Sequence, residues 1–306
     1  MIYLEPFIHA LFKSIVPSDI PKELDVILEG GAMNGVYQAG VLTYLKFLEN
    51  KQITQVKRVS GVSCGALVAV LYLTNTLGKL EDFYVRLANC FNETGNFEVL
   101  NECIDEVLST LDDSSLAKLN GRLFISYIDI SSHKRVVVSE YNTINDLRSA
   151  LQSTSHLPYI IDGKTTTKDN GFDGGMPYVF PLTTNNNTRC CRKTLYVRLT
   201  SIRVLKGALS TMKSVDGASK AVEGIQKLQE LLTTGSGNDM VSYVEDWGYI
   251  DYIMQWSKHL VWWLIVAIVE FIVYMLDRVP AAKNVTTTIR DIWADYGCRI
   301  IQKMSD

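Results

Sequence analysis

The chain has 306 residues, of which 47 % are hydrophobic and 21 % charged, and its formal net charge is −3. These values are typical of one large globular domain, or of one domain with an appendage, that buries a sizeable core. With 30 basic and 33 acidic residues and no strongly basic run, a nucleic-acid partner is not expected. The six cysteines lack metal-ligand spacing, so we predict reduced thiols in the cytoplasm, no metal site and no cofactor.

The N-terminus predicts an amphipathic helix within residues 1–20 and no signal peptide. Glu5 interrupts the first apolar stretch, no basic region precedes it, and no small-residue cleavage site follows. Apolar residues then repeat at helical spacing, namely Phe7, Ile8, Leu11, Phe12, Ile15 and Val16. Such a stripe favours packing on the core, and a helix lying on a membrane surface is the alternative.

Two strand–turn–helix units follow. Residues 24–28 predict a buried strand, which a glycine-rich turn at 29–35 connects to a helix with one apolar face. Residues 56–60 predict the next strand, and a tight turn at 61–65 leads into an apolar helix at 66–76. This order implies the α/β class, with a mostly parallel central sheet flanked by helices.

The pattern of the later chain is more varied. It predicts helices within 80–111, at 143–153 and at 214–232, and strands at 123–130, 135–139 and 195–204.

The segment 260–276 is set apart by its apolar composition, which only Glu270 interrupts. Trp262, Trp263 and Tyr274 place aromatic side chains near both ends, as at the two interfaces of a bilayer. The length is at the lower limit of the roughly 17–25 residues that span a membrane. A central glutamate would cost about 2.5–3.5 kcal/mol there. The segment therefore predicts either a single membrane-inserted helix or a buried C-terminal helix.

Ser63 is the candidate nucleophile, because residues 61–65 read Gly-Val-Ser-Cys-Gly and fit the pattern G-x-S-x-G. A serine between a strand and a helix must lie on a sharp turn, and Gly61 and Gly65 keep that turn open to a substrate. The N-terminus of the next helix points at the position where negative charge develops. An ordinary Gly/Ser turn is the alternative, but the predicted strand before the motif and helix after it favour the nucleophile.

The turn at Gly30, Gly31 and Ala32 is the candidate oxyanion hole. Acyl transfer requires backbone N–H groups directed at the oxyanion, and small residues let the backbone approach. A phosphate-binding P-loop is excluded because no Gly-Lys-Ser/Thr follows, and Ala32 spoils a dinucleotide fingerprint. Asp173 begins an Asp-Gly-Gly run that on its own would indicate a surface turn.

Three ordered motifs together resemble the patatin-like phospholipases. That family carries D-G-G-G-x-R-G, then G-x-S-x-G, then D-G-G or D-G-A. The corresponding residues here are Glu-Gly-Gly-Ala-Met-Asn-Gly at 29–35, the motif at 61–65, and Asp-Gly-Gly at 173–175, while 153–158 resemble the family's approach to the aspartate. The resemblance covers about 24–182 and implies a patatin-like three-layer fold. Its motif glycines are Gly35, Gly61, Gly65, Gly174 and Gly175.

Three positions depart from this pattern. Glu29 replaces the usual aspartate, and Ala32 replaces a glycine, which requires a negative φ at that residue. Asn34 replaces the usual arginine, so the arginine's role is either unfilled or taken by the Asn34 amide.

The resemblance implies a lipid acyl hydrolase with a Ser63–Asp173 dyad, acting on phospholipid or acylglycerol at a membrane surface. An α/β-hydrolase triad of Ser63, Asp173 and His259 is an alternative, because it preserves the order nucleophile, acid, histidine. A catalytically decayed, membrane-associated binding protein is another. We predict a catalytic domain at 21–206 and a helical region at 207–306 after the N-terminal helix.

Overall fold

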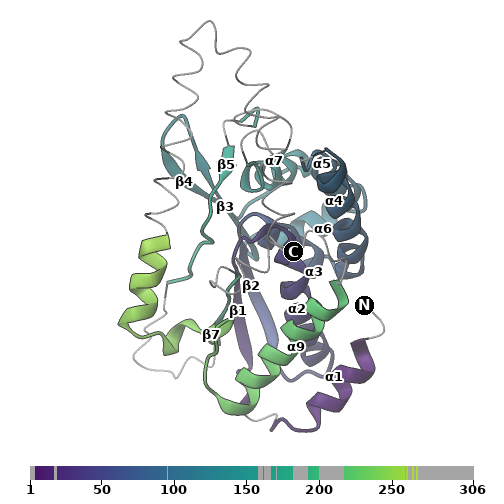
Figure 1. Cartoon of the computed structure of the whole chain (residues 1–306), viewed down its shortest axis with the longest axis vertical. Helices are drawn as coiled ribbons and strands as arrows, with labels where there is room; N and C mark the ends of the chain where they lie inside the picture. The colour runs from purple at the N-terminus through teal and green to yellow at the C-terminus, as the bar shows by residue number, and fades with distance from the viewer. Residues whose placement is uncertain are drawn as a thin grey trace, which may run out of the picture.

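A seven-stranded mixed sheet organises the residues that the computed structural model describes. These residues are 4–16, 19–94, 96–157, 161, 167–169, 171–181, 192–199, 217–258, 260, 264 and 267. The strand order is β4–β3–β2–β1–β6–β7, and β5 pairs with β3 away from this path (Figure 1). The strands are β1 (Glu23–Leu28), β2 (Gln55–Gly61), β3 (Leu123–Asp129), β4 (Lys134–Val138), β5 (Gly171–Asp173), β6 (Arg192–Val197) and β7 (Val241–Tyr243).

The centre of the sheet is parallel and its margins are antiparallel. Strand β1 runs parallel to β2 on one side and to β6 on the other, and β2 runs parallel to β3. Strands β4 and β5 are antiparallel to β3, and β7 is antiparallel to β6. The turns after β1 and β2 therefore lie at the same edge, outside the carboxyl ends of the strands, where open α/β sheets bind ligands.

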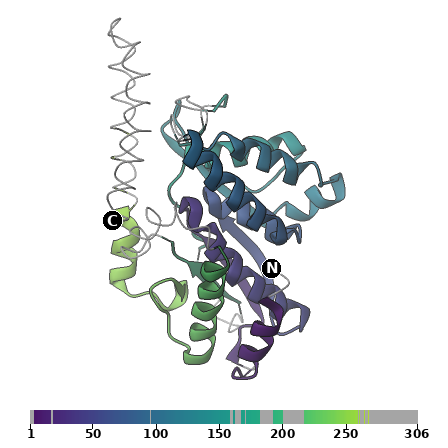
Figure 2. The ribbon, with the colours of Figure 1, turned by 45° about the vertical axis from the view of Figure 1, so that its right-hand side comes forward.

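Helices cover one face of the sheet over a large hydrophobic core (Figures 1 and 2). They are α1 (Glu5–Phe12), α2 (Gly35–Asn50), α3 (Cys64–Leu73), α4 (Leu80–Thr94), α5 (Val99–Leu108), α6 (Asp113–Leu119), α7 (Ile144–Thr154) and α9 (Gly217–Thr234). Two short turns, η3 (Ala32–Asn34) and η4 (Leu77–Lys79), precede α2 and α4.

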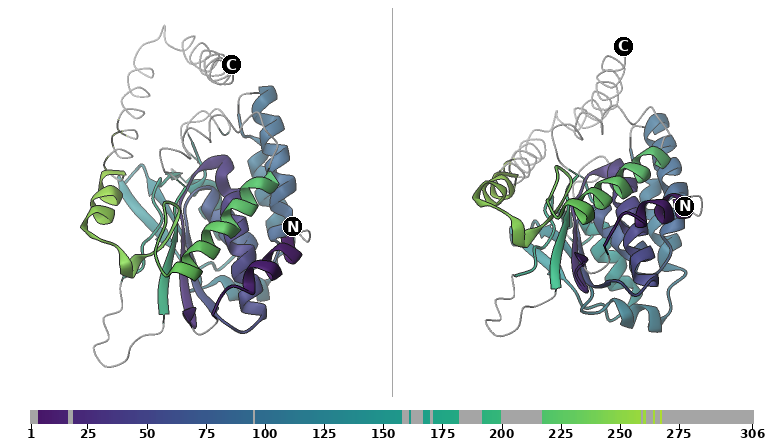
Figure 3. Two further views of the ribbon diagram at one scale, coloured as in Figure 1. Left: turned by 60° about the horizontal axis from the view of Figure 1, so that its bottom comes forward. Right: turned by 90° about the horizontal axis from the view of Figure 1, so that it is seen from below.

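The opposite face carries a second, smaller core. Ile27, Phe180, Tyr196 and Val244 are buried together there, with Trp247 packed against them. The turn η5 (Val244–Asp246) and the helical residues 249–258 cover this face, so the sheet lies between two helical layers (Figure 3). The predicted three-layer α/β fold is thereby confirmed.

The N-terminal helix α1 contacts the core. Ile8 is buried, and Phe7, Leu11 and Phe12 pack beside it. Gln229 of α9 donates hydrogen bonds to Leu11 O (3.0 Å) and Ser14 Oγ (2.8 Å). This placement agrees with the core-packing interpretation of the apolar stripe at residues 7–16.

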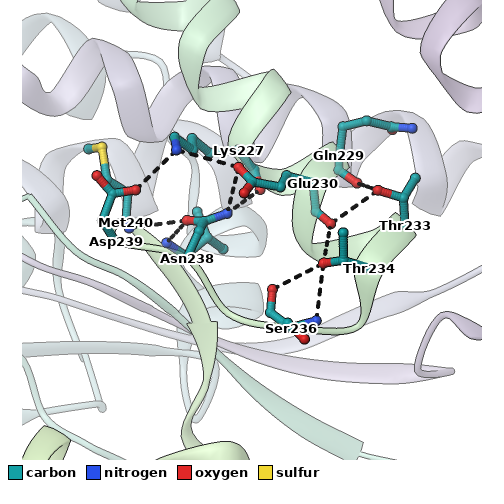
Figure 4. A network of polar contacts seen from close by, with 10 residues as sticks. Lys227, Gln229, Glu230, Thr233, Thr234, Ser236, Asn238, Asp239 and Met240 are labelled. Atoms are coloured by element: carbon teal, nitrogen blue, oxygen red, sulfur yellow. Dashed lines mark hydrogen bonds and ion pairs between the residues drawn. The ribbon is translucent and has the colours of Figure 1, made fainter.

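The turn between α9 and β7 is held by polar side chains (Figure 4). Asn238 donates to Lys227 O at 2.9 Å, and its Oδ1 accepts the N–H groups of Met240 (3.1 Å) and Val241 (2.8 Å). Lys227 Nζ lies 3.1 Å from an oxygen of Asp239. These contacts direct the chain from α9 onto the edge of the sheet.

Most predicted elements up to residue 199 are present, with ends shifted by a few residues. Strands β5 and β7 and the helical residues 249–258 were not predicted. The predicted division at 206/207 stays a prediction, but α9 and β7 pack on the same sheet as the elements before them. The predicted apolar helix at 260–276 lies outside the described residues except at 260, 264 and 267. In the described part of the chain, no helix combines the length and the apolar run needed to cross a bilayer.

Candidate active site

Ser63 lies on a strained turn between β2 and α3. Its φ of 55° and ψ of −132° are rare for a residue with a side chain, and such strain is typical of a nucleophile held at the tip of a turn. A Cβ at Gly61 would lie 2.6 Å from Ala66 N, and one at Gly65 would lie 2.7 Å from Glu29 O. Both glycines of the motif are therefore required by close backbone contacts.

Thr154, at the end of α7, supports this turn. The backbone N–H of Ser63 donates to Thr154 Oγ1 at 2.9 Å, and Thr154 Oγ1 donates to Ser126 O on β3 at 2.7 Å. Ser126 Oγ in turn donates to Met176 O at 2.8 Å. One hydroxyl thus connects the nucleophile turn to the strand that pairs with β5. The segment 153–158 includes Thr154 but does not reveal this role, because the role depends on contacts far apart in the sequence.

We expect Thr154→Val to lower kcat by about tenfold or more while the protein still folds. The substitution keeps the shape but leaves the Ser63 N–H and Ser126 O without their shared partner, at about 1–3 kcal/mol for each buried group. Ester hydrolysis and urea unfolding would be measured together. Thr43→Val is the matched control, because the Thr43 hydroxyl donates to Ala39 O in the preceding turn of its own helix. An equal fall in kcat for both variants would contradict the prediction.

Asp173 ends β5 and contacts Ser63. Its side chain is buried, it hydrogen bonds to the Ser63 side chain, and its Oδ1 accepts Gly175 N at 2.8 Å. Its own N–H donates to His156 O at 3.0 Å. Burial raises the pKa of Asp173 to about 6, although the hydrogen bonds from Ser63 and Gly175 act to lower it. A carboxylate of ordinary pKa is a weak base, so this shift suits proton transfer near neutral pH.

The two glycines after Asp173 have distinct structural reasons. Gly175 has a φ of 61°, a conformation that favours glycine. A Cβ at Gly174 would lie 3.1 Å from both Ser126 O and Tyr127 Cα. The run Asp-Gly-Gly therefore turns tightly against β3 and is not a surface turn.

The glycine-rich turn after β1 lies beside Ser63. A Cβ at Gly30 would be 3.1 Å from Ser63 Cβ, and a Cβ at Gly31 would be 2.8 Å from Leu199 Cβ. Ala32 begins η3, and a 3₁₀ turn has negative φ, so the backbone accepts alanine at this position. Cys64 follows Ser63 at the start of α3, where its backbone N–H is a further candidate oxyanion donor.

Cys64 also brings a thiol next to Ser63. Burial raises the pKa of this thiol to about 12, and hydrogen bonds from the backbones of Gly31, Gly65 and Gly35 only partly oppose the shift. The thiol is therefore protonated at neutral pH and does not compete with Ser63 as a nucleophile.

Glu29 stabilises the same turn through hydrogen bonds of its side chain and its carbonyl. Its buried carboxylate accepts hydrogen bonds from Tyr196 Oη, Leu199 N and Lys258 Nζ, each at 2.8 Å. Its carbonyl accepts Gln38 Nε2 at 2.7 Å. The side chain of Glu29 therefore connects this turn to β6 and to Lys258, which both follow the motif in the sequence.

The ammonium group of Lys220 lies close to Asn34 in the same turn. Lys220 Nζ, from α9, donates to Asn34 Oδ1 at 3.0 Å and lies 5.7 Å from the centre of the Tyr84 ring. Burial lowers the pKa of Lys220 to about 8, opposed by Glu223. A lysine side chain therefore lies beside Asn34, at the position where the motif usually has arginine. No local pattern could pair a lysine of α9 with this asparagine.

A cavity of about 370 Å³ opens onto Ser63 and Asp173. Gly30, Gly31, Asn34 and Cys64 line it near the two polar side chains. The remaining wall is largely apolar and includes Leu67, Val68, Leu80, Leu87, Phe97 and Leu100. A mostly apolar cavity with a few convergent polar groups is typical of a site for a small apolar ligand.

The candidate residues Ser63, Asp173, Gly30 and Gly31 thus lie together at one cavity, with Ala32 next in the turn. His259 lies outside the described residues, so the predicted alternative triad stays untested. His133 is exposed at a hairpin turn, and His9 packs edge-on against Phe47. His156 is buried and contributes its backbone carbonyl to Asp173.

These features define an α/β protein in which a serine on a strained strand-to-helix turn lies beside a buried carboxylate. A family model described as patatin-like phospholipase matches residues 26–188, which is more than half of the chain. The chain therefore belongs to the patatin-like phospholipase family, a family of lipid acyl hydrolases. A comparison with individually curated proteins gave no match.

Proposed function

We propose that this protein hydrolyses the acyl esters of lipids with Ser63 as nucleophile and Asp173 as its base. The observation that carries the proposal is the contact between buried Asp173 and Ser63, which both line an apolar cavity. Serine hydroxyls react slowly until a base removes the proton, and Asp173 is placed to do so without a histidine.

The reaction proceeds in two halves. Asp173 takes the proton as Ser63 Oγ attacks the ester carbonyl, and backbone N–H groups of Gly30, Gly31 and Ala32 stabilise the oxyanion. Asp173 then returns the proton to the leaving alcohol or lysolipid, which departs. In the second half Asp173 removes a proton from water as the water attacks the acyl-enzyme, and it gives that proton to Ser63 Oγ as the fatty acid departs. The apolar wall of the cavity holds the acyl chain.

We expect kcat/KM to rise with pH and to level off above an apparent pKa of about 6. Asp173 must be ionised to act as base, and its raised pKa sets the midpoint of this single-proton step. Initial rates on a soluble ester between pH 4.5 and 8 would give the profile. A midpoint near pH 4 would contradict the assignment of the titrating group to buried Asp173.

The proposed reaction is tested by fatty-acid release from mixed phospholipid vesicles. We expect activity to be lost in Ser63→Ala and Asp173→Asn and kept in His259→Ala. Loss in all three variants, with the third still folded, would indicate the triad instead. An inactive wild type whose Ser63 also fails to react with a fluorophosphonate would favour a decayed binding protein.

A further inference from the structure

In the helical residues 249–258, Asp251, Gln255 and Lys258 face the protein, whereas the aromatic and aliphatic side chains are exposed. Tyr249 is 81 % exposed, Ile253 47 % and Trp256 66 %. These three positions are spaced as neighbours on one helical face, and Leu260 (56 %) and Leu264 (59 %) continue the same stripe. A helix at the surface of a protein in water normally has the reverse polarity.

The inward face is polar and specifically bonded. Asp251 accepts Gly248 N at 3.0 Å and lies 3.6 Å from Arg198, while Gln255 donates to the Tyr196 hydroxyl. Lys258 forms its ion pair with Glu29 at 2.8 Å. Both charged residues of 249–258 are therefore engaged with the body of the protein, and the outward face carries aromatic and aliphatic side chains.

The inward contacts lead directly to the active-site turn. Tyr196 and Lys258 both bond to Oε1 of Glu29, and Gly30, the next residue, lies against Ser63. Lys258 is thus bonded to the residue that precedes Gly30 and Gly31, which line the cavity.

We propose that the exposed apolar stripe of 249–258, continued by Leu260 and Leu264, forms the surface by which this protein docks on a lipid bilayer. Tyr and Trp concentrate at the interfacial region of bilayers, and this stripe carries both. It has no outward charge to favour a charged partner, and it runs into the apolar sequence 260–276. The bilayer is also where a lipid substrate would be found, and that part of the argument rests on the proposed function.

Binding is tested in the full chain carrying Ser63→Ala, so that the outcome does not depend on hydrolysis. We expect the added substitutions Tyr249→Ser, Ile253→Ser and Trp256→Ser to reduce cosedimentation with phosphatidylcholine vesicles at least fivefold. The control is Val16→Ser, since Val16 is 59 % exposed on a different part of the surface and its loss should change nothing. Because the stripe is uncharged, raising the salt concentration should not release the wild type.

A second measurement locates the contact. In a protein whose other four tryptophans are replaced by phenylalanine, vesicles of brominated phosphatidylcholine should quench Trp256 fluorescence. Bound protein without quenching would overturn the proposal, as would equal binding by the triple variant. It would also be overturned if the wild type dimerised without vesicles and the triple variant did not, because a second copy would then cover the stripe. If the protein hydrolyses lipid but does not bind vesicles, the docking proposal fails and the proposed function stands. If it binds vesicles but does not hydrolyse lipid, the docking proposal stands and the proposed function fails.

Discussion

Replacing Asp173 with asparagine should abolish turnover and at the same time stabilise the folded protein at neutral pH. The catalytic loss should reach at least about 10³-fold, because the base that activates the nucleophile is removed. The free energy of unfolding should rise because the Asp173 of the wild type is ionised at pH 8 and its burial penalises the charged form.

The direction of the pH effect follows from the raised pKa. An ordinary aspartate, with a pKa near 3.8, represents the unfolded chain, and the folded value is about 6. Between these values the folded state binds more protons, so the stability of the wild type falls as pH rises through this window. The resulting loss of wild-type stability reaches about 3 kcal/mol above pH 6 and vanishes below pH 4. The variant lacks this dependence.

Urea unfolding of wild type and Asp173→Asn at pH 4.5 and pH 8 would measure the effect. The difference between the two proteins should be larger at pH 8. Asp113→Asn is the matched control, since Asp113 is exposed on α6 and should show no such divergence. A variant that is less stable than the wild type at pH 8 would mean that Asp173 is held mainly by favourable hydrogen bonds and not strained by burial.

Substituting alanine at Gly40 or Gly224 should cause the largest losses of stability away from the active site. A Cβ at Gly40 would lie 2.0 Å from Ala221 O on α9, and one at Gly224 would lie 2.2 Å from Tyr37 O on α2. Both clashes involve backbone atoms, so the helices must separate. We expect a loss of about 3 kcal/mol or more, which outweighs the roughly 1 kcal/mol that alanine contributes to a helix.

Gly78→Ala is the control, because a Cβ there meets nothing within 4 Å. Its free energy of unfolding should change by no more than about 1 kcal/mol. If Gly40→Ala and Gly224→Ala unfolded at the same urea concentration as this control, α9 would not be packed on α2 as described.

The candidate active site was predictable because its signals are local. The turn at Ser63 follows a strand and precedes a helix, and Gly61 and Gly65 mark it in the sequence, although the close contact that requires Gly65 is with Glu29 of the turn after β1. The roles of Thr154, Lys220 and Lys258 were not predictable, because each depends on a partner far away in the chain. Strands β5 and β7 have only three residues each, too few for alternation to show.

The exposure of the apolar residues of 249–258 could not be predicted for a different reason. Periodicity reveals that a helix has two faces, but not which face contacts the protein. The contacts of Asp251, Gln255 and Lys258 decide this, and they depend on Arg198, Tyr196 and Glu29, which belong to other elements.

The central position of β1 has a consequence for synthesis of the chain. One neighbour, β2, is close in sequence, but the other is β6, and the contact of Glu23 with Arg192 spans 169 positions. Until β6 has left the ribosome, the strand that leads into the active-site turn has one unpaired edge, which is open to association with other chains. Because such distant pairing forms slowly, the sheet should close late in folding. A chain ended at residue 188, where the family match ends, would lack β6 and should aggregate rather than fold.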